Sequence, residues 1–91
     1  MREVHKGDEV LVRVIVDKGA FPQESLITLD SKEGPISGFI RSDKILSEGS
    51  EHYIPAVVLD ITEDTITVKL RGSFFTTTGL AVMTSQSLRA A

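Results

Sequence analysis

The fold is decided by GDEVLVRVIVDKGAF, the stretch from Gly7 to Phe21. Side chains of a β-strand alternate between its two faces, so residues at every second position share a face. One face of this stretch carries four valines, namely Val10, Val12, Val14 and Val16. The other face is mixed, with Leu11, Arg13, Ile15 and Asp17. Because β-branched side chains suit a pleated, half-buried surface, the stretch predicts a long first strand whose valine face lies on the core.

Shorter β-type runs follow, and residues typical of turns separate them. The predicted strands are 24–31, 36–40, 52–61, 65–71 and 80–83. Gly38 predicts a weak point or a bulge in its strand, and Pro55 predicts an edge, a bulge or a strand start. Single helical turns are expected at 41–46, with Ser42 as the N-cap, and at 85–88. Residues 47–51 read as a polar connection.

These elements predict one all-β domain spanning residues 1–91, with frayed tails at 1–6 and 89–91. No long segment has apolar residues at i, i+3, i+4 and i+7, so we expect no helix longer than two turns. Short strands separated by turns are typical of a small barrel, here one of five or six strands.

Composition excludes several classes of function. The chain has no cysteine, so it has no disulfide, no thiolate metal site and no cysteine nucleophile. Its two histidines, His5 and His52, are far apart and lack a paired carboxylate motif, so we expect no metal site. No phosphate loop, GxSxG, HExxH or dinucleotide motif is present. We therefore expect a protein that is not an enzyme and has no cofactor.

Charge and hydropathy bear on partners and location. The net charge is −3 and the pI is about 5.3, which weighs against a strongly basic nucleic-acid binder. The first nine residues, MREVHKGDE, contain no apolar segment of the kind that a signal peptide needs. No apolar run approaches the roughly 18 residues that a membrane helix needs. We expect a cytoplasmic protein without membrane contact.

Five segments, taken in order, resemble the S-one-type RNA-binding domain, a family with the OB fold. They are Gly7–Val10, Gly19–Phe21, Gly38–Ile40, Ala56–Ile61 and Thr65–Leu70. The resemblance implies an OB-like barrel with one face that binds single-stranded RNA. An SH3-like barrel is the alternative, because a final strand followed by one turn, here at 80–88, is typical of that architecture.

A face that binds single strands needs aromatic rings to stack on bases and cations to contact phosphates. The candidate residues are Arg13, Lys18, Phe21, Phe39, Arg41 and Lys44. In an OB-like barrel, Phe21 and Phe39 are expected on neighbouring strands of one face, with Arg13 and Arg41 beside them. In the alternative interpretation Phe39 lies in the core and Phe21 closes the end of the barrel.

The adjacent pair Phe74-Phe75 predicts a second kind of surface. Consecutive strand residues point to opposite faces, so one ring is exposed or covered by a partner unless a bulge intervenes. With Leu80 or Met83 it would form an apolar patch, which predicts a homo-oligomer or a protein partner. Closure of a barrel end is the other interpretation. Two functions thus stay open: an RNA-binding module, and a protein-interaction or assembly module.

Overall fold

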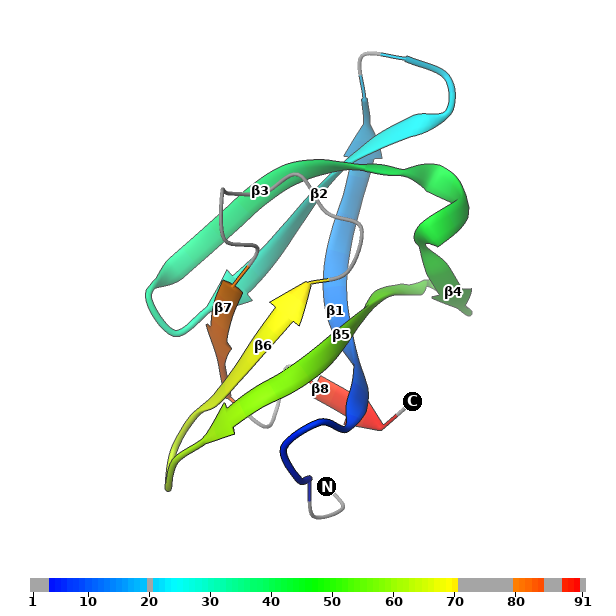
Figure 1. Ribbon diagram of the computed structural model, residues 1–91. Helices are drawn as coiled ribbons and strands as arrows, with labels where there is room; N and C mark the ends of the chain where they lie inside the picture. Colours follow the sequence, from blue (N-terminus) through cyan, green and yellow to red (C-terminus); the bar gives the residue numbers. More distant parts are fainter. Residues whose placement is uncertain (1–3, 20, 71–79, 85–87, 91) are drawn as a thin grey trace.

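A computed structural model describes residues 4–19, 21–70, 80–84 and 88–90. These residues form one antiparallel sheet that curls into half a barrel (Figure 1). Its strands are β1 (Glu9–Lys18), β2 (Glu24–Ser31), β3 (Gly34–Arg41), β4 (Leu46–Glu48), β5 (Glu51–Ile61), β6 (Ile66–Leu70), β7 (Leu80–Met83) and β8 (Leu88–Ala90). One 3-10 turn, η1 (Ser42–Lys44), follows β3. The expected class, a small all-β barrel, is confirmed.

The strands lie in the order β3-β2-β1-β5-β6-β7. Three consecutive strands are joined in sequence, and β5 returns to lie beside β1, which is the Greek-key order. β1 is the shared strand. Its first part, Glu9–Val14, pairs with β5, and its last part, Ile15–Lys18, pairs with β2. β8 pairs with Val10–Val12 along the edge of β1 that β5 does not occupy.

The core is built from the inward positions of these strands. Val10, Val12 and Val14 are buried and Val16 is half-buried, so the predicted valine face does lie on the core. The inward residues of the other strands are Ile27, Leu29, Ile40, Ile54, Ala56, Val58, Ile66, Val68, Leu70, Ala81, Met83 and Leu88. β2 and β7 have the predicted bounds, and the alternation predicted for Ile66, Val68 and Leu70 is confirmed.

A hydrogen bond between distant parts of the sheet maintains its curl. The backbone N–H of Lys32, in the turn between β2 and β3, donates to the carbonyl of Val82 in β7 at 2.7 Å. This contact joins the end of the β2–β3 hairpin to β7, at the far edge of the sheet (Figure 1).

Two polar segments form strands that the sequence does not predict. Within the expected connection at 47–51, β4 pairs with the start of β5, and Gly49 provides the positive φ of the turn between them. Arg89 and Ala90, which fall in the tail expected at 89–91, belong to β8. Both strands are only three residues long and are defined by the strand that they pair with.

The structure tests the local predictions made for Gly38, Ser42 and Pro55. Gly38 pairs with Ile27 in regular register, so of the two alternatives predicted for it, a weak point or a bulge, the bulge is wrong. Among the described residues, the register shifts between Val58 and Asp60. Ser42 is not the N-cap, because η1 begins at Ser42 itself. Pro55 pairs with β1 on one side, and on the other it falls after the β4 pairing and before the β6 pairing. The backbone nitrogen of Pro55, which carries no hydrogen, is therefore at a local edge of the sheet, as predicted.

Candidate nucleic-acid interface

The outer face of β1, β2 and β3, opposite the core, presents two cross-strand rows. Pairing places Asp17 beside Leu26 and Leu26 beside Phe39. It also places Ile15, Thr28 and Ser37 in a row, where the hydroxyls of Thr28 and Ser37 are 2.8 Å apart. Ile15 is 70% exposed and Phe39 is 41% exposed. The described residues therefore leave apolar side chains open on this face.

Phe39 lies outward because its neighbours in β3 lie inward. Gly38 and Ile40 are both buried, and strand alternation then directs Phe39 to the opposite face. The interpretation that places Phe39 in the core is thus wrong, and its ring is available on the surface.

Phe21 lies in the loop between β1 and β2 rather than on a strand. The N–H of Gly19 donates to the carbonyl of Glu24 at 3.2 Å, and the N–H of Glu24 donates to the carbonyl of Phe21 at 3.0 Å. A Cβ at Gly19 would lie 2.5 Å from the Glu24 oxygen, so this close approach requires glycine. The tight loop leaves Phe21 66% exposed, which contradicts the interpretation that it closes the barrel end.

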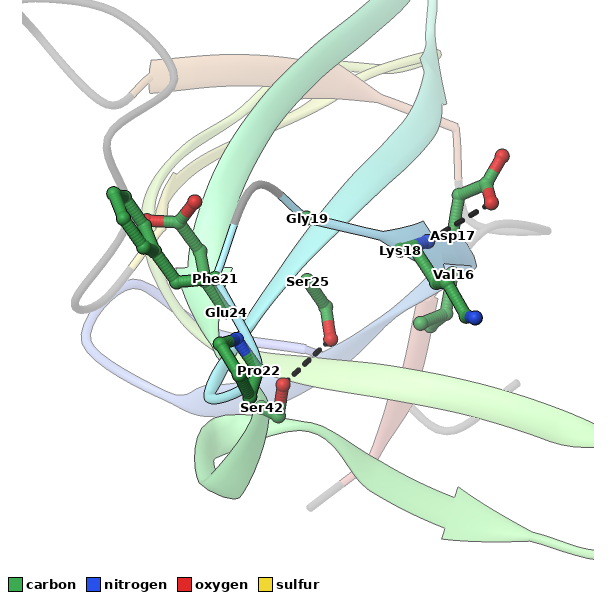
Figure 2. A pocket seen from close by; sticks show the side chains of 9 residues that line it. All are labelled: Val16, Asp17, Lys18, Gly19, Phe21, Pro22, Glu24, Ser25 and Ser42. Carbon is green, nitrogen blue, oxygen red and sulfur yellow. Dashed lines mark hydrogen bonds between the residues drawn. The ribbon is translucent and has the colours of Figure 1, made fainter.

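A hollow of about 610 Å³ opens beside this loop (Figure 2). Its lining residues are Val16, Asp17, Lys18, Gly19, Phe21, Pro22, Glu24, Ser25 and Ser42. The hydroxyl oxygens of Ser25 and Ser42 are 2.7 Å apart and tie the start of β2 to η1. Ser25 is buried and Ser42 is half-buried, and their hydroxyl pair lies between Phe21 and Pro22 on one side and Val16 and Lys18 on the other.

A second hollow, of about 460 Å³, shares part of its lining with the first. Phe21, Gln23, Glu24 and Arg41 line it. Glu24 and Arg41 are direct partners across β2 and β3. Because Phe21 and Glu24 line both hollows, they form the wall that the two share.

The predicted cations divide into two groups. Lys18, Arg41 and Lys44 lie near one end of the sheet, where β1 ends, β2 begins and β3 runs into η1. Arg41 contacts Asp43 at 3.0 Å in an exposed ion pair. Arg13 lies four residues before Asp17 on β1, about 13 Å along a strand. The structure therefore places Phe21, Phe39 and three of the cations toward the same end of the sheet and leaves Arg13 apart.

Arg13 belongs to a different cluster, which sequence reasoning missed. It contacts Glu51 at 3.0 Å, and the Tyr53 hydroxyl donates to the other carboxylate oxygen of Glu51 at 2.5 Å. The Tyr53 hydroxyl and then the Arg13 charge hold the pKa of Glu51 below its ordinary value. Arg89 of β8 lies 5.5 Å from the centre of the Tyr53 ring and forms an ion pair with Glu48. This cluster ties β8 to the β4–β5 hairpin.

The predicted apolar interface is only partly visible. Phe74 and Phe75 lie outside the described residues, as does the side chain of Leu80. Met83 is completely buried, because it lies inward on β7 opposite Ile66. The expectation that Met83 contributes to a surface patch is therefore wrong.

In the part of the chain that the structure describes, no three His, Asp or Glu side chains are placed to hold a metal ion. No helix among the same residues is long and apolar enough to cross a membrane. Comparisons with protein-family models, with curated proteins and with solved structures find no match to this chain.

Proposed function

We propose that the chain is a nucleic-acid-binding module that holds single-stranded RNA at the end of the sheet where Phe21 and Phe39 lie. The observation that carries the proposal is the exposure of these two rings, one on the β1–β2 loop and one on the outer face of β3. Exposed aromatic rings beside cations are what single-strand binders use, because a base of any identity can stack on them.

The topology supports an OB-like barrel as the finer description. The OB fold is a Greek-key barrel that binds oligonucleotides with the face of its second and third strands and with the loop between its first and second strands. Phe39 and Phe21 occupy these two places, and β5, β1, β2 and β3 have the Greek-key order. The absence of cysteine suits a reducing compartment, and we propose that the protein acts in the cytoplasm.

Charge near the two rings indicates a binding mode that depends more on stacking than on phosphate contacts. Lys18, Arg41 and Lys44 are accompanied by three carboxylates nearby, those of Asp17, Glu24 and Asp43. If three cations contact phosphates, a plot of the logarithm of the affinity against the logarithm of the salt concentration should have a slope of about −2. A strongly basic groove would give a much steeper slope.

The test is fluorescence anisotropy with a labelled single-stranded RNA of ten nucleotides, at low salt and over a salt series. We expect Phe21→Ala and Phe39→Ala each to weaken binding by roughly 5- to 100-fold, the loss of one stacked base. Leu59→Ala is the matched control, because Leu59 is 43% exposed on β5, away from both rings. Absence of binding at low salt, or equal weakening by the control, would contradict the proposal.

The exposed Ile15 favours a second candidate, a protein-interaction or homo-oligomeric assembly module without enzymatic activity. An exposed apolar side chain on the same outer face as Leu26 and Phe39 suits a protein partner as well as a base. Light scattering distinguishes the two. A dimer that Ile15→Asp dissociates, in a protein that binds no RNA, would favour assembly.

A further inference from the structure

We infer that the wall shared by the two hollows, made by Phe21 and Glu24, is a guanine subsite. The inference rests on the proposed binding of single-stranded RNA and names the base that this part of the surface selects. In it, a guanine stacks on the Phe21 ring and presents its Watson–Crick edge to the Glu24 carboxylate.

The composition of the larger hollow favours a base over a phosphate. Its charged side chains are two carboxylates, Asp17 and Glu24, and one ammonium, Lys18. The net charge of these side chains is negative, so it would repel a phosphate but not a neutral base. The volume of about 610 Å³ is within the usual range for small-ligand sites. Val16, Phe21 and Pro22 supply apolar walls against which a flat ring can lie.

A carboxylate selects among bases because it accepts hydrogen bonds and cannot donate them. Guanine has two adjacent donors on its Watson–Crick edge, N1–H and the N2 amino group. The amino groups of adenine and cytosine stand next to a ring nitrogen that is an acceptor. The single N–H of uracil lies between two carbonyls. Paired donation to one carboxylate is therefore possible only for guanine among the four.

Glu24, rather than Asp17, is assigned to this contact. One Asp17 carboxylate oxygen already accepts the backbone N–H of Lys18 at 2.8 Å. Glu24 lines both hollows together with Phe21, and its carboxylate lies on the same side of the loop as the ring (Figure 2). A base stacked on Phe21 thus has Glu24 at its edge.

One further group completes the subsite. Arg41 lines the second hollow next to Phe21 and Glu24, where it can contact the phosphate of the adjoining nucleotide. The exposed ion pair between Arg41 and Asp43 contributes little free energy, so Arg41 can also contact a phosphate.

The test uses one labelled ten-nucleotide oligouridine and variants in which a single central base is guanine, adenine, cytosine or hypoxanthine. We expect guanine to bind at least tenfold more tightly than the other three standard bases. Hypoxanthine, which lacks the N2 amino group, should bind with intermediate affinity. Glu24→Gln should remove the guanine preference and leave the affinity for oligouridine within about threefold. Glu33→Gln, in the exposed β2–β3 turn, is the matched control.

The outcomes separate the two proposals. If no oligonucleotide binds, RNA binding itself fails and the guanine subsite fails with it. If all oligonucleotides bind with equal affinity, RNA binding stands and the guanine subsite is overturned. If the guanine preference persists in Glu24→Gln, the assignment to Glu24 is overturned. Circular dichroism of each variant checks that the sheet is intact.

Discussion

Val14 and Ile15 are neighbours on β1 with opposite environments, since Val14 is 4% exposed and Ile15 is 70% exposed. We expect Val14→Asp to unfold the domain, because an unpaired buried carboxylate costs several kcal/mol, comparable to the stability of a small domain. Ile15→Asp should change the stability by less than about 1 kcal/mol, the range of strand propensities. Thermal and urea melts of both variants provide the measurement.

The comparison is informative because the two substitutions are chemically alike and adjacent. If Val14→Asp melted as the native protein does, the valine face would not be the core face. If Ile15→Asp were as destabilising as Val14→Asp, the outer face of β1 would be covered in the folded protein.

At the level of single residues, the sequence predicts which side chains are buried better than it predicts the site. The period-two valines are a direct signal of the inward face. The exposure of Phe39 had a signal too, because Ile36 and Ile40 share a face that Phe39 does not. The placement of Glu24, Ser25 and Ser42 beside one another had no local signal, since it depends on which strand and turn lie next to β2.

β8 is a three-residue strand that two kinds of contact attach to the sheet. Leu88 is buried in the core, whereas Arg89 makes its contacts with Glu48 and Tyr53 at the surface. We expect Leu88→Ala to lower the free energy of unfolding by about 2–5 kcal/mol, as is usual for buried leucines. Arg89→Ala should lower it only slightly, because exposed ion pairs contribute little. Urea denaturation compares the two, and a larger effect of Arg89→Ala would contradict this account.

Glu51 gives the same cluster a pH dependence with a defined sign. Its pKa is lower in the folded than in the unfolded chain, so the folded state favours the ionised carboxylate. This stabilisation is present above the ordinary carboxyl pKa and is lost as the pH falls through the lowered value. Because the group is exposed, the contribution is small.

Strand positions were predictable where a strand has its own pattern. The runs at 24–31 and 80–83 alternate or are continuously apolar, and both are strands with those bounds. β4 and β8 are short and polar in part, and only pairing with β5 and β1 makes them strands. Such elements have no signature in their own residues, because their hydrogen bonds are supplied by distant segments.

On the scale of the whole molecule, the order of the strands decides where the site can form. The Greek-key return places β5 beside β1 and leaves the outer face of β1, β2 and β3 with its exposed side chains. The sequence predicts an all-β barrel but not this order, because pairing of strands that are distant in the chain carries no local pattern. The approach of Arg41 to Glu24 follows instead from the β2–β3 hairpin, whose register makes the two residues partners.

Because several strands pair with β1, its residues should also be among the last to open. Strand β5 flanks its first part on one edge and β8 flanks Val10–Val12 on the other, so these residues cannot separate from the sheet unless two pairings open together. Amide protons exchange with solvent only during such openings. Exchange measured by NMR should therefore be slowest at β1 and its β5 partners, and faster at Ser47 in the short hairpin. Slowest exchange in β4 or β8 would contradict this. The strand that decides the fold is then also the last part of the molecule to open.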